Sequence, residues 1–193
     1  TAPNNTGIAS GLDLNRDGHI AGEEDIPSPK YAADCWGWGE YPGQYSMALY
    51  SKFPIDTANA RTFQHFQWMD LYEHHLPVDY YGEDIAGALR LSSKSHWDIP
   101  VKTPAGTLHL WVSHPTPPGF DGDEDRNGRR NFDELKFWWL YMDGCPRLYD
   151  DTGKYGGYDK KQPFLIAGDL NADPYDGAEY DGTPAIGQLL NHR

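Results

Sequence analysis

Residues 161–174 read KQPFLIAGDLNADP and carry the clearest indication of the architecture. The apolar run Phe164–Ala167, which ends at Gly168, predicts a buried central strand. Asp169 and Asn171 come directly after it, and side chains two residues apart in an extended chain point to the same side. Because α/β folds place their sites in loops that follow strand ends, both residues are site candidates.

Two further runs, residues 89–101 and 107–115, show partial alternation and are joined by KTPAG, so they predict a β-hairpin. The second run finishes on His114, a side chain that can hold or donate a proton near neutral pH. We expect His114 to converge with Asp169 and Asn171 on one cavity that can seat a divalent cation. The alternative is a strand-end hydrogen bonder for the histidine and a turn former for the aspartate.

Shorter segments add to a mixed pattern. Residues 47–50 predict an apolar strand that stops before Pro54. Residues 60–68 favour a strand because aromatic and β-favouring residues dominate them. Strands and helices in mixed order indicate an α/β or α+β fold.

The best helix signal covers residues 131–142. Asn131 is a good N-cap, and Glu134 has the spacing of a capping box. Gly144 and Pro146 end the helix. The apolar residues follow at i, i+3, i+4 and i+7 and indicate a face that packs in the core rather than a binding platform. This face comprises Leu135, Trp138, Trp139 and Met142.

Length and charge limit the classes of function. The 193 residues carry 16 Lys and Arg against 29 Asp and Glu, a formal charge of −13, and their number suits a single domain. Aromatic residues make up 14% of the chain, which argues against disorder. No apolar run approaches the ~18 residues of a membrane span. The acidity argues against non-specific binding of duplex DNA, which needs clustered Lys and Arg.

Residues 13–24, DLNRDGHIAGEE, match the twelve-position calcium loop, with Gly18 at the tight turn. They lie in residues 1–44, a long irregular segment whose flanks around the loop are not helical, so we expect a standalone loop. An acidic solvated turn is the alternative. Residues 123–134 match less well, because Arg130 occupies the apolar eighth position. The predicted Ca²⁺ ligands are Asp13, Asn15, Asp17, His19 and Glu24.

Cys35 and Cys145 are the two cysteines of the chain. Their separation excludes a CxxC metal site, which leaves either one disulfide or two free thiols. A disulfide would place the protein outside the cytoplasm, and we expect a secreted protein on that basis.

Six motifs in chain order resemble those of a known family. They are GQYSMA at 43–48, SKFPI at 51–55, LSSKSHWD at 91–98, SHPTPP at 113–118, DRNGRRN at 125–131 and GDLNADP at 168–174. Together they resemble the endonuclease/exonuclease/phosphatase superfamily, with its deoxyribonuclease-like fold, and in particular its bacterial phosphatase-like or hydrolase-like branch. The resemblance covers most of residues 40–190.

The resemblance implies a sandwich of two β-sheets flanked by helices and metal-dependent hydrolysis of phosphate esters. His114 would contact the scissile phosphate, Asp169 would orient or deprotonate the attacking water, and Asn171 would contact metal or phosphate. Mg²⁺ or Mn²⁺, held by Asp169 and Asn171, would supply the positive charge that the acidic chain lacks. The candidate phosphate contacts are Arg130 and Asn131 at the helix start, with Lys94 and His96 as further candidates.

Two family features have no counterpart in the sequence: a metal-binding glutamate on an early strand and a Ser-Asp-His stretch near the C-terminus. Glu23, Glu24 and Glu40 do not follow a predicted strand. We therefore expect residues 1–193 to be a single, incomplete domain, an internal part of a hydrolase that lacks some of its site. The alternative function is a calcium-stabilised structural or binding module without catalysis. Within the enzyme class, nucleic acid, phospholipid and small phosphoester substrates stay open, and the charge favours a small phosphoester.

Overall fold

The computed structural model describes residues 3–159 and 161–192. It contains one long helix, several short helices and strands, and 3-10 turns at Glu23–Asp25 and Trp68–Asp70. The mixed composition confirms the expected fold class. In chain order the elements are α1 (Pro29–Ala33), β1 (Arg61–Thr62), α2 (Val78–Tyr81), α3 (Glu83–Ala86), β2 (His96–Thr103), β3 (Gly106–Ser113), α4 (Arg126–Met142), β4 (Phe164–Ala167), β5 (Glu179–Tyr180), β6 (Thr183–Pro184) and α5 (Gly187–Leu190).

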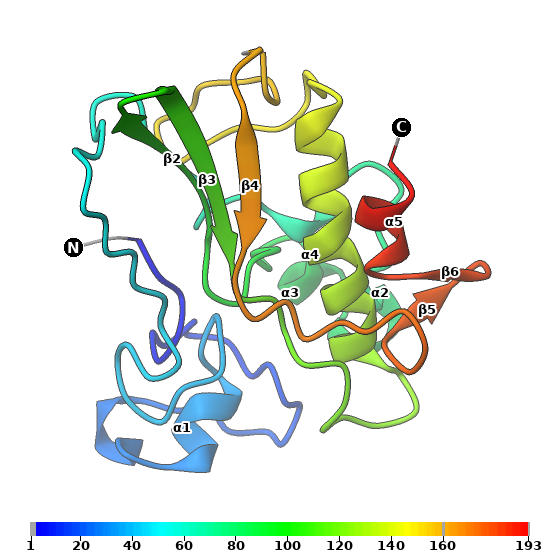
Figure 1. Ribbon diagram of the computed structural model, residues 1–193. Coiled ribbons are helices and arrows are strands. Elements are labelled where there is room, and N and C mark those ends of the chain that lie inside the picture. The colour runs from blue at the N-terminus through cyan, green and yellow to red at the C-terminus, as the bar shows by residue number, and fades with distance from the viewer. Residues whose placement is uncertain (1–2, 160, 193) are drawn as a thin grey trace.

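The larger sheet has four strands in the order β1-β2-β3-β4 (Figure 1). β2 and β3 pair antiparallel with His96 opposite Ser113, which confirms the hairpin, although its first strand begins only at His96. β4 lies parallel to β3, with Ala167 opposite Val112. The carboxyl ends of β3 and β4 and the start of β2 therefore lie at the same edge of the sheet.

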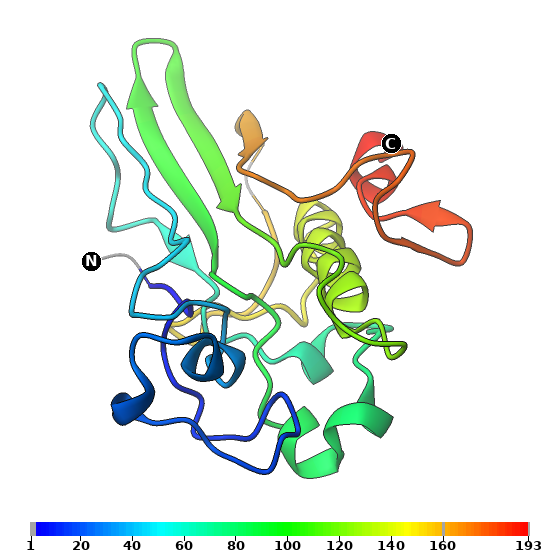
Figure 2. The same ribbon diagram turned by 90° about the horizontal axis from the view of Figure 1, so that it is seen from below.

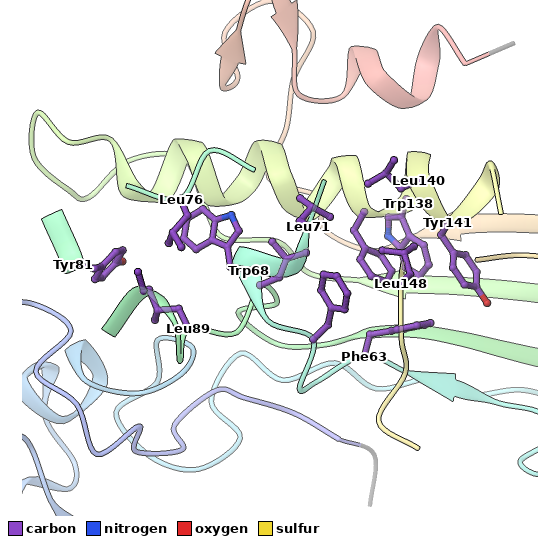
Figure 3. Close-up of a cluster of buried hydrophobic side chains, with 14 of the residues drawn as sticks. Phe63, Trp68, Leu71, Leu76, Tyr81, Leu89, Trp138, Leu140, Tyr141 and Leu148 are labelled. Atoms are coloured by element: carbon purple, nitrogen blue, oxygen red, sulfur yellow. The ribbon is translucent and has the colours of Figure 1, made fainter. Parts of the chain in front are cut away.

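The main core lies between the sheet and one face of α4. Trp138 of α4 stacks on Trp111 of β3 with ring centroids 5.4 Å apart, and both side chains are fully buried. Phe63 and Tyr141 pack edge-on in the same cluster, and Figure 3 shows them beside Trp138. Burial of each large apolar side chain stabilises the fold by roughly 1.5–3 kcal/mol. The predicted core role of Trp138 is confirmed.

A second, two-stranded sheet is formed by β5 and β6, which pair antiparallel. Figures 1 and 2 both place α4 between the four-stranded sheet and this pair, with α5 beside α4. Residues 3–44 contain only α1 and the first 3-10 turn as regular helices. No helix among the described residues is long and apolar enough to cross a membrane.

Two predicted strands differ from the structure. Residues 47–50 form no strand, and Tyr50 is 95% exposed, because no described strand pairs with this segment. An isolated bridge from Ile55 to Val101 is what attaches the following residues to the sheet. Of residues 60–68, Arg61–Thr62 alone forms a strand, and the chain then turns toward the 3-10 turn. Aromatic content here reflects burial in the core, as at Phe63 and Phe66, rather than pairing.

The prediction of a buried central strand at residues 164–167 is wrong in its placement. β4 exists with the predicted bounds, but among the described residues it pairs with β3 alone, so it is an edge strand. Phe164 is 41% and Leu165 53% exposed. An apolar run indicates that a strand can be buried on both faces, but its position in the sheet depends on which segments pair with it.

The predicted start of the long helix is also wrong. α4 begins at Arg126, so Asn131 lies inside the helix and does not cap it, and Glu134 forms no capping box. The carboxylate of Asp121 accepts the backbone N–H of Asn127 at 2.6 Å, which satisfies one of the free donors of the first turn. This external partner allows the helix to extend upstream through Gly128.

Cys35 and Cys145 are both free thiols, so the disulfide alternative is wrong. Cys35 is buried, and its thiol donates to the backbone carbonyl of Tyr31 at 3.2 Å. The expected secretion of the protein loses its basis in a disulfide, and the location stays a prediction.

Candidate functional site

Three chain segments meet at the sheet edge where β3 and β4 end. His114 follows β3 directly, and Asp169 comes two residues after the last residue of β4. Nε2 of His114 lies 3.9 Å from Oδ2 of Asp169. Lys94, two residues before β2, is the third side chain at this edge, and it interacts electrostatically with both. The structure thus brings together the histidine and the aspartate that the sequence singled out.

The backbone around Gly168 explains why the site begins there. Gly168 has φ +143°, and a Cβ at this position would lie 1.9 Å from the carbonyl oxygen of Ser113. A residue with a side chain would therefore clash with β3 as well as strain the backbone. Glycine lets the chain pass closely along the end of β3, which places Asp169 next to His114.

Asn171 ties the loop after β4 to the loop after β3. Its backbone N–H donates to Oδ1 of Asp169 at 3.1 Å, and its Nδ2 donates to the carbonyl of Pro115 at 3.0 Å. Its φ of 48° lies in the left-handed region, which Asn tolerates better than most residues. The side-chain carbonyl of Asn171 and the carboxylate of Asp169 are oxygen donors at this edge.

Asn131 lies below this loop in the core. Its Nδ2 donates to the backbone carbonyls of Thr116, Leu170 and Asn171 at 2.8, 3.1 and 3.2 Å. The side chain is fully buried, and it belongs to the interior of α4, so it is not part of a helix N-terminus that faces an anion. In this structure Asn131 holds the loop that carries the candidate catalytic residues.

Lys94 is 5% exposed, and no hydrogen bond of its ammonium group is found among the described residues. Burial lowers its pKa to about 8; the nearby Arg130 adds to this shift, while Glu134 and Asp169 oppose it. A buried cation without a partner is unfavourable, so the site is suited to an anionic ligand.

His114 is half-buried, and burial lowers its pKa from the ordinary value. Lys94 lowers the pKa further, while Asp169, Glu134 and the backbone carbonyl of Tyr45 raise it. The imidazole is therefore neutral near pH 7, and it can accept a proton or donate one N–H.

Arg130 and His96 are engaged in structural hydrogen bonds, contrary to the expectation that they contact phosphate. Arg130 donates to the backbone carbonyls of Trp36, Arg90 and Leu91, each at 2.9 Å, so it braces two segments of the chain. His96 is fully buried, with Nδ1 bonded to the hydroxyl of Ser92 and Nε2 to a backbone carbonyl of α4. Since both ring nitrogens are occupied, His96 offers none to a phosphate.

Glu134 is the residue at this site that sequence reasoning missed. The side chain is 1% exposed, and its carboxylate accepts bonds from Ser93 and Thr116, which flank Lys94 and His114. The prediction assigned Glu134 to a helix cap because the helix start was placed too late. A useful signal was available: in α4 the acidic pair at 133–134 sits between the apolar Phe132 and Leu135.

Comparison with known families provides the classification. The model of the endonuclease/exonuclease/phosphatase family matches residues 9–187, which is most of the chain. This chain belongs to that family. Comparisons with curated proteins and with solved structures give no match. Members of the endonuclease/exonuclease/phosphatase family are hydrolases that act on phosphate esters, and they typically use divalent metals such as Mg²⁺.

The sheet edge offers a partial ligand set for the metal of the endonuclease/exonuclease/phosphatase family. Among the described residues no group of three or more His, Cys, Asp and Glu side chains is arranged to hold a metal. Asp169 is 70% exposed at its side chain, and with Asn171 it presents hard oxygen donors. Mg²⁺ commonly takes one or two carboxylates and fills its other positions with water and substrate oxygens. The two oxygen donors at this edge are of the type that Mg²⁺ or Mn²⁺ takes, and they form part of a ligand set.

The predicted calcium loop folds into a tight turn. The carboxylate of Asp13 accepts the backbone N–H groups of Asp17 and Gly18, and Asp17 accepts that of His19. The ring of His19 contacts the carboxylate of Asp25 at 3.1 Å. These bonds shape the turn, and calcium binding stays a prediction.

A cavity of about 540 Å³ lies on the other side of α4, away from His114 and Asp169. It is formed between α4, the β5–β6 pair and α5. Because its lining shares no residue with the sheet edge, it does not belong to the candidate active site. Its lining residues are His75, Phe132, Lys136, Trp139, Asp143, Tyr180, Asp181, Thr183, Gly187, Gln188, Asn191 and His192.

Proposed function

We propose that this protein hydrolyses a phosphate ester by attack of water, with Mg²⁺ or Mn²⁺ as cofactor. The observation that carries the proposal is the contact of His114 with Asp169 at the common end of two parallel strands, with the buried Lys94 beside them. Family membership supports the reaction class. The arrangement supplies an acid–base pair and a positive charge at one point.

Each residue has a distinct task in this proposal. Asp169 orients the attacking water and accepts its proton as the new P–O bond forms, while the ester P–O bond breaks. His114 donates its ring N–H to a phosphate oxygen and fixes the phosphate beside the water. Lys94 offsets the negative charge that increases on the phosphate oxygens. Asp169 and Asn171 would hold a divalent ion, which when bound would supply positive charge to the phosphate.

A small phosphoester is the substrate class that we favour. The formal charge of −13 opposes the approach of a long polyanion such as duplex DNA. Arg130 is already bonded to backbone carbonyls, so Lys94 is the free cation near His114 within residues 3–159 and 161–192. The positive charge at the site is therefore local.

Hydrolysis of bis-p-nitrophenyl phosphate with Mg²⁺ or Mn²⁺, and with EDTA, tests the function. His114→Ala and Asp169→Ala should each lower kcat by at least about 10²-fold, the usual loss for a general acid–base or orienting group. Asp176→Ala, an exposed carboxylate on the same loop, is the matched control and should retain activity. No metal-dependent hydrolysis by the wild-type protein, or equal rates for all three variants, would refute the proposal.

A further inference from the structure

Two consecutive residues of α4, Asp133 and Glu134, are buried carboxylates with 0% and 1% exposure. Asp133 accepts the indole N–H of Trp68 and the backbone N–H of His75, both at 2.6 Å, and its other oxygen contacts Nδ1 of His75 at 2.7 Å. These contacts attach the segment of residues 68–75 to α4. Glu134 serves a different part of the molecule.

Glu134 connects two loops of the sheet edge. Oε1 accepts the backbone N–H of Ser93 at 2.7 Å and its hydroxyl at 3.0 Å, while Oε2 accepts the backbone N–H of Thr116 at 2.6 Å. Ser93 precedes Lys94, and Thr116 follows His114 by two residues. One carboxylate therefore sets the distance between the loops that carry the cation and the imidazole.

The same turn of α4 also holds the third loop. Asn131, three residues earlier, donates to the carbonyls of Thr116 and Asn171. The backbone carbonyl of Glu134 meets Nε2 of His96 at the start of β2. A buried carboxylate is costly unless it is fully hydrogen-bonded. The three donors around the carboxylate of Glu134 therefore strongly restrict which side chain can replace it. An apolar residue would fill the space without joining the loops.

We propose that Glu134 is a positioning residue that holds the loops of Lys94 and His114 in a fixed relation at the sheet edge. The catalytic consequence rests on the proposed function. Displacement of a reacting group by about 1 Å can cost 10²-fold in rate, so loss of this carboxylate acts on kcat more than on KM.

The alternative is that Glu134 only stabilises the fold, and Asp133 provides the matched control. Glu134→Gln keeps the size of the side chain but places an amide N–H group against one of two backbone donors, so one loop loses its bond. Asp133→Asn makes the same change one residue away and leaves both site loops attached to Glu134. Both variants lose a buried carboxylate of comparable exposure.

The first measurement is independent of activity. Amide hydrogen exchange of Ser93 and Thr116, and the imidazole NMR signals of His114, are compared in the wild type, Glu134→Gln and Asp133→Asn. We expect exchange to accelerate about tenfold or more at one or both amides, with shifted His114 signals, in Glu134→Gln alone. Unchanged exchange and signals in that variant, or the same changes in Asp133→Asn, would overturn the proposal.

The second measurement is the kinetics of bis-p-nitrophenyl phosphate hydrolysis. Glu134→Gln should lower kcat by about 10- to 100-fold with KM within about twofold, while Asp133→Asn stays near the wild type. Ser93→Ala, which removes one of the three bonds to Glu134 and a 3.4 Å contact with the backbone carbonyl of His114, should have a smaller effect. If Glu134→Gln does not fold, Ser93→Ala replaces it in both measurements: smaller changes in the same directions support the proposal, and unchanged exchange, His114 signals and kcat overturn it. An inactive wild-type protein refutes the proposed function, whereas the exchange comparison still decides the positioning.

Discussion

Nε2 of His114 lies 3.9 Å from Oδ2 of Asp169, and the two residues come from loops after neighbouring parallel strands. Parallel pairing makes this contact possible, because both strands end at the same edge of the sheet. Burial keeps His114 neutral, while the side chain of Asp169 is largely exposed. The pair therefore joins a shielded base to a carboxylate that a ligand can reach from solvent.

Gly168→Ala should impair both stability and activity. The new Cβ would lie 1.9 Å from the carbonyl of Ser113, so β3 and the loop of Asp169 must move apart. We expect the unfolding free energy to fall by about 1–3 kcal/mol, together with a loss of phosphodiester hydrolysis. Gly153→Ala is the control, because φ is +81° there but no heavy atom lies within 4 Å. A chemical-denaturation midpoint for both variants checks this; equal losses would show that backbone strain alone matters.

Lys94→Met should separate stability from function. Lys94 is a buried cation without a hydrogen-bond partner in the described part of the chain. Its removal should leave the unfolding free energy at pH 7 unchanged or raised, while phosphodiester hydrolysis falls about 10-fold or more.

The difference in unfolding free energy between the wild type and Lys94→Met should change with pH in a defined direction. The folded pKa of about 8 lies below the ordinary 10.5, so the unfolded chain binds the proton more tightly between these values. The wild-type protein should therefore gain up to roughly 3 kcal/mol of stability between pH 8 and 10.5 relative to the variant. Urea melts of both proteins across this range measure the difference, and parallel curves would contradict it.

His96→Gln should reduce the dependence of the unfolding free energy on pH below pH 6.5. Burial lowers the pKa of His96 to about 4, while the unfolded chain takes up the proton near 6.5. Stability from this group is complete above pH 6.5, and roughly 3 kcal/mol is lost as the pH falls to 4. Urea melts between pH 4 and 7 should show this loss in the wild type and a smaller slope in the variant. Identical slopes would show that the ring is not held neutral.

The two thiols should differ in reactivity. Burial raises the pKa of Cys35 to about 11, whereas Cys145 is only half-buried. Under native conditions at pH 8, a thiol reagent such as Ellman's reagent should modify Cys145 well before Cys35. In denaturant both should react at once. Two unreactive cysteines after denaturation without reductant would reveal a disulfide and contradict the structure.

The placement of much of the candidate site was predictable, because its residues lie at the ends of strands that short-range patterns indicate. The hairpin of β2 and β3, the bounds of β4 and the positions of His114 and Asp169 follow from alternation, apolar runs and glycine. The roles of Arg130, His96 and Glu134 were not predictable, because each depends on partners far along the chain. Arg130 donates to the backbone carbonyls of Trp36 and Leu91, and no local sequence pattern indicates these contacts.

Local properties of the chain, its motifs and its periodicity, were enough to predict the family, the mixed α/β class and the candidate pair at the two strand ends. Tertiary structure alone decided that β4 is an edge strand, that α4 begins at Arg126, and that Glu134 joins the loops of Lys94 and His114. The sequence does not distinguish a buried carboxylate from an exposed one, or a central strand from an edge strand, until the partners of each are known. Those partners are chosen by packing between segments that are remote along the chain.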